Sequence, residues 1–405
     1  LLRRSADVGS YAGQWGAIAG HAEGDPDAAA WAEIGEESGL HDAATLVRRG
    51  EPFDVRDADL GTHWVVHPYL FDCARRDASV NWETTEAEWV RPTAIRRRDT
   101  VPQLWTSYAR VAPTIDAIAT DREHGSAYIS IRALEVLRDR AGAYATGTKE
   151  ADDSTEALRH LAQDLLEARP SMAALRNRIN HVMQDTAPDH APSAVEDAAH
   201  AAVHRALQAD TDTAERAAGY IADRAVLTLS RSGTVLDALL GADPLPRRVF
   251  VAESRPDREG VVVAETLADA GLDVTLLSDA GVAMRLSENV VDVVLVGADT
   301  VLATGALVNK TGTRMAALAA KHESVPFYTT MATDKVATHD TPQLEDGPPA
   351  ALYSGDAALD VRNPTFDVTP AGLISGYITE QGILHASEIR DLAFELEGWA
   401  RWQED

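Results

Sequence analysis

The sequence predicts an α/β protein in three consecutive parts: a small mixed α/β domain, a helical subdomain and a larger domain built on a parallel β-sheet. Short apolar runs alternate with turns in residues 1–112, and long stretches at helical spacing fill most of residues 113–215. Residues 216–405 alternate continuous apolar runs with amphipathic segments. With 405 residues and 45% hydrophobic content, the chain is long enough for separate cores.

The first part is predicted to contain one helix among short strands such as HWVVHPYLFD. Asp25 followed by Pro26 is typical of a helix N-cap and first helical position, and Gly39 is typical of the residue just past a helix C-terminus. We therefore expect a helix over residues 26–38. Because the chain begins with Leu-Leu-Arg-Arg and not with methionine, we also expect that N-terminal residues are missing, including part of a first strand.

Three glutamates share one face of this predicted helix: Glu33, Glu36 and Glu37, at positions i, i+3 and i+4. Like charges at this spacing repel one another, and the negative C-terminal end of the helix dipole is a poor place for them. Two interpretations stay open, a cation-binding site and a solvated acidic helix end. The position of the glutamates favours the cation-binding site.

The run AEIGEESGL, residues 32–40, resembles the end of the Nudix hydrolase signature, and QWGAIAG and WETTEAEWVRP resemble other Nudix segments. The resemblance covers about the first 110 residues. It implies an α/β/α sandwich in which the three glutamates hold Mg²⁺, with Glu36 and Glu37 also serving hydrolysis of a diphosphate compound. Two positions depart from the signature, since Ala32 replaces its arginine and Gly24 replaces its upstream glutamate.

The middle part is predicted to be helical. ISIRALEVLRDRAGAYA and MAALRNRINHVMQ place apolar residues at helical spacing. The polar stretch TGTKEADDST and the proline-bearing turn TAPDHAPS interrupt this pattern. We therefore expect several helices separated by these two stretches.

The third part is predicted to be a parallel sheet covered by helices on both faces, because continuous apolar strands alternate with amphipathic helices. The predicted strands are AVLTLS, RVFVAES, VTLLSD, VDVVLVGAD and PFYTTM. The predicted helices between them include TVLDALL, GVVVAETLADAG and TRMAALAAKH.

The most specific stretch of the chain is VDVVLVGADTVLATGALVNKTGT, residues 291–313. Its strand ends at Asp299, at the sheet edge where open α/β sheets bind ligands. A lysine, an amide, two hydroxyls and a glycine then open the next helix and predict a phosphate cradle. These residues are Asn309, Lys310, Thr311, Gly312 and Thr313. The alternative interpretation makes Asp299 a turn residue and Thr311 a helix cap.

Six ordered motifs resemble the family that contains the alpha, beta and delta subunits of translation initiation factor 2B, archaeal ribose-1,5-bisphosphate isomerase and methylthioribose-1-phosphate isomerase. They are LTLSRSGTVLDAL, VAESRPDREG, LLSDAGVAM, VGADTV with GALVNKTGT, PFYTTM, and NPTFDVTPAGLISGYITEQGIL. The resemblance covers about the last 280 residues. It implies a helical subdomain, a Rossmann-like domain, and dimers or larger assemblies.

The same resemblance implies roles for individual residues. In the isomerases a cysteine and an aspartate act as acid and base, and the aspartate matches Asp299. The cysteine position falls at Ser230, whose hydroxyl is far less acidic than a thiol, so the substitution argues against isomerisation and leaves ligand binding intact. Phosphate-holding roles fall on Arg255, Asn309 and Lys310, with Ser232, Gly233 and Thr234 as further candidates.

The amino-acid composition restricts the cellular setting of the protein and the classes of partner that it can bind. A net charge of -27 with four lysines indicates adaptation to high salt, so we expect a haloarchaeal origin. The same negative charge argues against direct nucleic-acid binding. Cys73 is the only cysteine, which excludes an intrachain disulfide and predicts a reducing, cytoplasmic setting. No apolar run of about 18 residues predicts a membrane span.

These observations predict a fusion whose third part binds a nucleotide or sugar phosphate and forms homo-oligomers. The first part is a candidate magnesium-dependent diphosphate hydrolase. Two alternatives stay open for the third part: a sugar phosphate isomerase of the ribose-1,5-bisphosphate type, and a non-catalytic subunit that contacts initiation factor 2.

Overall fold

The computed structural model describes residues 1–147, 151–344 and 346–404, and the chain divides into two compact units. The first unit comprises Leu1–Thr114 and Arg138–Ser154, and the second comprises Ile115–Leu137 and Thr155–Asp405. The predicted domain boundaries after residues 112 and 215 stay predictions. Among the helices of the described ranges, none is long and apolar enough to cross a membrane.

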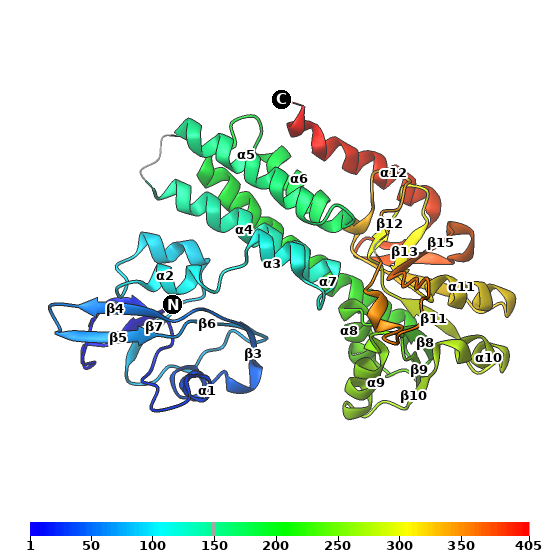
Figure 1. Cartoon of the computed structure of the whole chain (residues 1–405), viewed down its shortest axis with the longest axis horizontal. Coiled ribbons are helices and arrows are strands. Elements are labelled where there is room, and N and C mark those ends of the chain that lie inside the picture. Colours follow the sequence, from blue (N-terminus) through cyan, green and yellow to red (C-terminus); the bar gives the residue numbers. More distant parts are fainter. Residues whose placement is uncertain (148–150, 345, 405) are drawn as a thin grey trace. The chain divides into compact units, whose positions relative to one another are not determined.

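The first unit is a mixed α/β structure of short antiparallel strands and the helix α1 (Figure 1). In the described residues its strands form a three-stranded sheet, β2-β1-β7, and two strand pairs, β3-β6 and β4-β5. Its assignment as a Nudix α/β/α sandwich stays a prediction. The elements are β1 (Leu2–Arg4), β2 (Trp15–Gly16), α1 (Pro26–Ser38), β3 (Ala44–Arg49), β4 (Phe53–Asp57), β5 (Thr62–Val66), β6 (Tyr69–Cys73), β7 (Thr84–Ala87) and α2 (Leu104–Ala109).

Helix α1 has the bounds that its capping residues predict. The Asp25 carboxylate accepts the backbone N–H of Asp27 at 3.1 Å, and Pro26 is the first helical residue. Gly39 adopts a φ of 65° and donates its N–H to the Gly35 carbonyl at 3.0 Å. The buried side chain of Ile34 anchors the helix to the rest of the unit.

The three glutamates of α1 have different environments. Glu36 is exposed, Glu33 is half-buried, and Glu37 is only 5% exposed. Burial, followed by the neighbouring carboxylates of Glu33 and Glu83, raises the pKa of Glu37 to about 7. Burial also raises the pKa of Glu33, followed by the charges of Glu36 and Glu83. The inner side of α1 therefore holds carboxylates that resist ionisation together.

The second unit begins with helices. The helices that the sequence predicts are present, and the predicted turn TAPDHAPS separates two of them. The other predicted break, TGTKEADDST, lies partly outside the described residues. The helices are α3 (Ile115–Thr120), α4 (Ser126–Ala145), α5 (Ala151–Ala168), α6 (Ala173–Asp185) and α7 (Pro192–Ile221), and α4 and α5 contribute residues to both units.

The core of the second unit is a seven-stranded sheet with the order β10-β9-β8-β11-β14-β16-β17. Figure 1 labels four of these strands, β8, β9, β10 and β11. All neighbours pair in parallel except β16 and β17. The predicted parallel sheet is thereby confirmed. The strands are β8 (Ala225–Leu229), β9 (Arg248–Ala252), β10 (Val274–Leu277), β11 (Val293–Val296), β14 (Phe327–Thr330), β16 (Gly376–Thr379) and β17 (Gly382–Leu384).

Helices cover both faces of this sheet, as the apolar strands predict. Side chains on one face pack with α7, α8 and α9, and those on the other face pack with α10, α11 and α12. Along β8, Val226 belongs to the first cluster and Leu227 to the second, because successive strand residues point to opposite faces. The helices are α8 (Gly233–Gly241), α9 (Glu259–Asp269), α10 (Val282–Ser287), α11 (Thr313–His322) and α12 (Ala386–Glu397).

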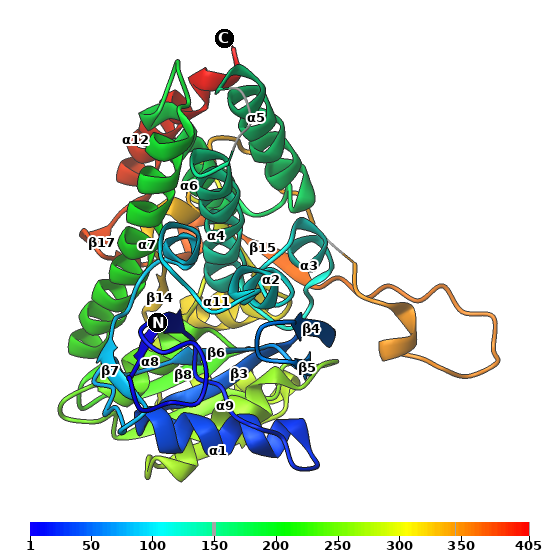
Figure 2. The same cartoon turned by 90° about the vertical axis from the view of Figure 1, so that its left-hand side faces the viewer.

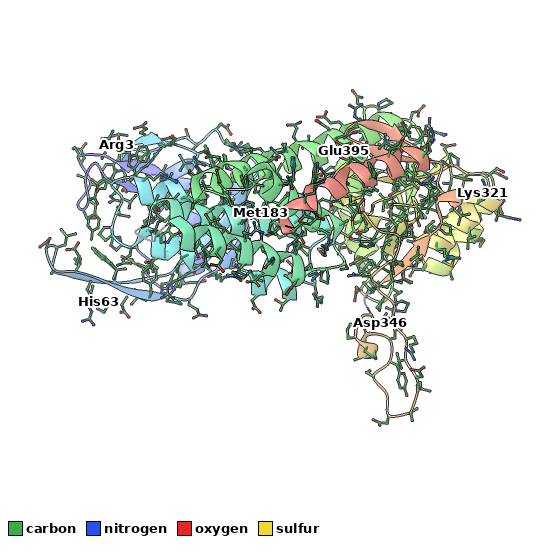
Figure 3. All side chains as sticks on the ribbon, turned by 90° about the horizontal axis from the view of Figure 1, so that it is seen from above. Arg3, His63, Met183, Lys321, Asp346 and Glu395 are labelled. Atoms are coloured by element: carbon green, nitrogen blue, oxygen red, sulfur yellow. The ribbon has the colours of Figure 1, made fainter. Side chains whose placement is uncertain are left out.

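A second, small sheet leads the chain into α11. It consists of β12 (Thr300–Val301), β13 (Leu307–Lys310) and β15 (Phe366–Thr369), all antiparallel. Between β14 and β15 a segment extends away from the body of the unit, as Figure 2 shows, and Asp346 in Figure 3 lies on this segment. The small sheet thus ties two distant parts of the chain together beside α11.

The raised pKa of Glu37 predicts a pH-dependent stability of the first unit. A carboxyl whose pKa is higher in the folded state stabilises that state at low pH, and this contribution is lost as the pH rises from about 4.5 through about 7. In Glu37→Gln, which cannot ionise, this loss should be absent. Hydrogen exchange of the α1 amides, corrected for intrinsic rates, should therefore show that the variant gains protection relative to the parent across this range.

The matched control is Glu36→Gln, at an exposed position on the same helix. It should follow the parent at every pH. Parallel curves for Glu37→Gln and the parent would contradict the assigned burial of this carboxyl.

Candidate functional site

Two neighbouring strands at the centre of the large sheet lead the chain in opposite directions. From β8 the chain continues to β9 on one side, whereas β11 is followed by β14 on the other side. Ligands bind at such a switch point, outside the carboxyl ends of the strands. Ser230 follows directly after β8, and the Gly297–Asp299 turn follows β11. The structure thus places Ser230 and Asp299 on the two sides of the switch point.

Ser230 has an unusual backbone conformation. Its φ is 63°, in the left-handed region that costs a non-glycine residue about 1–2 kcal/mol. Its N–H donates to the Ser254 hydroxyl at 2.7 Å, which holds the turn. Its own hydroxyl donates to Oε2 of Glu259 at 2.6 Å. The serine side chain is therefore directed at a carboxylate on the N-terminus of α9.

Lys310 contacts the other oxygen of the same carboxylate. Its Nζ lies 3.1 Å from Oε1 of Glu259, and the two side chains are 14% and 23% exposed. Lys310 is the last residue of β13 and also lies 5.8 Å from the centroid of the Phe366 ring. A shielded ion pair of this kind is stronger than an exposed one, because solvent screens it less.

The turn that carries Asp299 is held by contacts from distant parts of the chain. The buried Lys335 donates from Nζ to the Ala298 carbonyl at 2.8 Å. The Thr300 hydroxyl donates to the Ser171 carbonyl at 3.2 Å, and the Asp299 N–H donates to the Val308 carbonyl at 3.2 Å. The half-buried Asp299 is therefore presented by a rigid turn.

Helix α8 begins beside this turn. The Ser232 hydroxyl caps α8 by accepting the Val235 N–H at 3.4 Å, and Gly233 and Thr234 form the first helical positions. A Cβ at Gly297 would come within 2.5 Å of the Ser232 Oγ, so only glycine allows this close approach. The predicted residues Ser232, Gly233 and Thr234 thus bring a helix N-terminus, with its positive dipole end, to the switch point.

The predicted phosphate cradle at α11 holds a carboxylate of the chain itself. Asp367 Oδ2 accepts the Gly312 N–H at 2.8 Å, and both Asp367 oxygens accept the Arg314 N–H at 3.1 Å. Burial raises the pKa of Asp367 despite these donors. An external phosphate can use these amides only if it displaces Asp367.

The prediction from the sequence placed the start of α11 too early. Asn309 and Lys310 end β13 instead of opening the helix, because β13 pairs with β15 up to Lys310. Gly312 stands at the N-cap, and Thr313 is the first helical residue. Thr311 is not the cap, since its hydroxyl donates to the Pro364 carbonyl at 2.6 Å.

The hydroxyl of Thr313 is likewise used inside the protein. It donates to the Lys310 carbonyl at 2.6 Å and accepts from the Asn309 side-chain amide at 3.0 Å. Both Asn309 and Thr313 are buried. These two predicted ligand-binding residues therefore support the end of β13 that carries Lys310.

Arg255 lines an open depression of about 440 Å³ at the N-terminus of α11. Its backbone N–H donates to Asp279 Oδ2 at 2.8 Å, and its side chain is exposed. The depression combines two arginines with two carboxylates and a small apolar wall. It is lined by Arg255, Asp279, Thr311, Gly312, Arg314, Met315, Leu318 and Asp367.

Sequence reasoning missed Glu259, Asp367 and Lys335. Glu259 opens a helix directly after a strand of the same sheet, so its place at the ligand-binding edge was readable from the pattern ESRPDREG. Asp367 and Lys335 lie far along the chain from the groups that they contact. No local pattern indicates those two contacts.

The acidic helix of the first unit provides oxygen ligands of the type that Mg²⁺ prefers. The carboxylates of Glu36 and Glu83 contribute to the raised pKa of Glu33, and those of Glu33 and Glu83 contribute to the raised pKa of Glu37. Within the described ranges, however, no three His, Cys, Asp or Glu side chains are gathered in a way that could hold a metal ion. The donor type fits the ion, but the side-chain arrangement does not form a metal site.

Comparison with known proteins identifies the larger unit. Residues 122–386 match the initiation factor 2 subunit family. A ribose 1,5-bisphosphate isomerase of Archaeoglobus fulgidus is 33% identical over 73% of this chain and 96% of its own length. A methylthioribose-1-phosphate isomerase of Syntrophotalea carbinolica is 32% identical over 72% of this chain and 92% of its length.

The fold comparison agrees. The crystal structure of the Pyrococcus horikoshii translation initiation factor eIF-2B superposes with a TM-score of 0.56 and 27% identity, and the match covers 67% of this chain and 94% of that one. The family match spans helices α4 to α11 and the whole parallel sheet of the second unit, up to the start of α12. The chain therefore belongs to the initiation factor 2 subunit family.

Proposed function

We propose that the second unit binds a phosphorylated pentose at the switch point and interconverts its aldose and ketose forms, as a sugar phosphate isomerase of the ribose 1,5-bisphosphate type. The observation that carries this proposal is the placement of Ser230 and Asp299 on the two sides of the switch point. The 33% identity to a ribose 1,5-bisphosphate isomerase over nearly all of that protein supports it.

The chemistry of this reaction matches the groups at the site. Aldose–ketose interconversion moves a proton between adjacent carbons while negative charge develops on oxygen, so it needs proton-transferring groups and a cation. In our proposal Asp299 and Ser230 transfer protons. Lys310, whose ammonium group is largely shielded from solvent, contacts the bound sugar phosphate and stabilises the developing charge.

Phosphate binding is assigned to the groups around these three residues. The N-terminus of α8, with Ser232, Gly233 and Thr234, offers backbone N–H groups and a positive dipole end. Arg255 offers an exposed guanidinium at the depression beside α11. A bisphosphate has two anionic ends, and these two positions provide one cationic or dipolar group for each.

A phosphate-binding regulatory protein without turnover is the second candidate. The observation that favours it is Ser230 itself, because a serine hydroxyl is a much weaker acid than the thiol of the isomerases. In that case the unit would form homo-oligomers and contact initiation factor 2, and it would bind a nucleotide or sugar phosphate as an effector. Co-purification with initiation factor 2 at native salt would favour this candidate.

The proposed isomerase activity is tested first with the variant Asp299→Asn. The purified chain should convert ribose 1,5-bisphosphate, or another member of a panel of phosphorylated pentoses, to the ketose, measured by NMR or mass spectrometry. Asp299→Asn should lower kcat by about 100-fold or more, because an amide cannot take up the proton.

The control for this test is Asp269→Asn, at an exposed position on α9. It should retain the activity of the parent chain. Absence of turnover over the whole panel would exclude the isomerase and leave the binding protein.

Ligand binding is tested separately with Lys310→Ala. The variant should weaken the binding of a phosphorylated pentose by about 10- to 100-fold, since it loses a charged contact worth about 1.5–3 kcal/mol. Isothermal titration or ligand-induced thermal stabilisation at high salt measures the effect. Lys321→Ala, an exposed lysine on α11, is the matched control. Equal affinities for parent and Lys310→Ala would remove Lys310 from the site.

For the first unit, we propose a separate activity as a magnesium-dependent hydrolase of diphosphate compounds. The supporting observation is α1, which carries Glu33, Glu36 and Glu37 on the segment that resembles the end of the Nudix signature. The resemblance assigns Mg²⁺ to these three glutamates. Among the described residues, the side chains of these glutamates do not form a metal site.

The hydrolase proposal predicts release of phosphate or a monophosphate from nucleoside diphosphate compounds. This release should require Mg²⁺, stop on addition of a chelator, and be lost in Glu36→Gln and in Glu37→Gln. Glu51→Gln, at an exposed position of the same unit, should behave like the parent. Equal activity in all variants would assign the hydrolysis to a contaminant or to another site.

A further inference from the structure

Three side chains at the switch point form one connected chain of polar contacts. The Ser230 hydroxyl donates to Oε2 of Glu259 at 2.6 Å, and Lys310 Nζ lies 3.1 Å from Oε1 of the same carboxylate. All three come from different elements, the end of β8, the start of α9 and the end of β13. One carboxylate therefore joins the hydroxyl and the ammonium group of the proposed site.

The position of Glu259 is fixed by its neighbours. A Cβ at Gly260 would lie 1.9 Å from the Ala252 carbonyl oxygen, so glycine allows α9 to start directly against the end of β9. Glu259 is the first residue of α9, where the helix dipole favours a carboxylate. This packing holds the Glu259 side chain within reach of Ser230 and Lys310.

Proton transfer by Ser230 requires such a partner. A serine hydroxyl does not release its proton near neutral pH, whereas a thiol with a pKa near 8.5 can do so. A hydroxyl can still take up a proton if an adjacent base accepts the proton that it already carries. Glu259 is in hydrogen-bonding contact with that proton.

We propose that Glu259 is a positioning and proton-holding residue that, together with Ser230, replaces the missing thiol; this inference rests on the proposed isomerase function. As a proton leaves the substrate for Ser230 Oγ, the serine's own proton moves to Glu259 Oε2. The substrate gains one negative charge and Glu259 loses one. The two protons then return in reverse order, and the substrate receives its carbon-bound proton at the neighbouring carbon, whose bond to the ring oxygen breaks. Asp299 carries the proton of the hydroxyl that becomes the ketone to the released ring oxygen, so that all protons and bonds balance.

Lys310 couples this transfer to charge stabilisation. Before the transfer its ammonium group faces the ionised Glu259 at 3.1 Å. When Glu259 becomes neutral, its attraction for Lys310 falls, and the ammonium group, which also contacts the bound substrate, interacts more strongly with the oxyanion that forms on the substrate at the same moment. The Lys310 ammonium group thus exchanges its interaction with the Glu259 carboxylate for one with the substrate oxyanion. The net charge of the site does not change.

The test is a double-variant cycle with ribose 1,5-bisphosphate, or the pentose phosphate that the parent converts best. Parent, Glu259→Gln, Ser230→Cys and the double variant are compared for kcat and KM, and thermal melting checks that each chain is folded. Glutamine has the shape of glutamate and can accept the Ser230 hydrogen bond, but it cannot hold the proton. Glu265→Gln, an exposed position on α9, is the matched control.

The proposal predicts that Glu259→Gln lowers kcat by about 100-fold or more with serine at position 230 and leaves KM unchanged or lower. With cysteine at position 230, the same change should lower kcat by less than about 10-fold, because a thiol can exchange its proton without Glu259. Glu265→Gln should match the parent. A purely structural role for Glu259 would lower kcat equally in both backgrounds.

Three outcomes would overturn the inference. Equal losses in the serine and cysteine backgrounds would reject it while the isomerase function stands. Turnover by Ser230→Cys but not by the parent would show that Ser230 and Glu259 do not replace the thiol. Absence of turnover in both chains would overturn the proposed isomerase function together with the inference.

Discussion

The parallel pairing of β8 with β9 on one side and β11 on the other is the constraint on which the second unit depends. Each of these strands is buried on both faces, so its register is held by apolar packing with two helical layers. Because the strands are parallel, their carboxyl ends meet at one edge. That edge receives Ser230 from β8, Glu259 from the connection after β9, and Asp299 from β11. The positions of these three side chains all follow from this pairing.

Carboxylates of the protein itself contact the groups that could bind an external anion. Glu259 contacts Lys310, and Asp367 accepts the backbone amides at the start of α11. Both carboxylates are partly removed from solvent, where an unpaired charge would be costly. An incoming phosphate must therefore compete with internal anions of the protein.

Both units depart from the sequence patterns that they resemble at one chemically important position. In the first unit Ala32 stands at the position of the signature arginine, and Glu37 has a raised pKa among other carboxylates. In the second unit Ser230 stands at the cysteine position, and Glu259 and Lys310 stand beside it. The two units differ in the groups that surround these carboxylates. The carboxylates of α1 have like-charged neighbours, whereas Glu259 has a hydroxyl donor and a cation.

The high-salt origin that the composition suggests stays a prediction.

Local pattern was sufficient for much of this protein. The bounds of α1 followed from Asp25, Pro26 and Gly39, and strands β8, β9, β10, β11 and β14 of the large sheet followed from apolar periodicity, because caps and periodicity act within a few residues. Strands β16 and β17 were not predicted. Sequence also placed Ser230 and Asp299 at strand ends. Only the tertiary structure decided what these groups contact. Glu259 meets Ser230, and Asp367 meets Gly312, through strand order and pairing between segments far apart in the chain. Such contacts have no periodic signature, since each is made by a single side chain at the meeting point of separately folded elements.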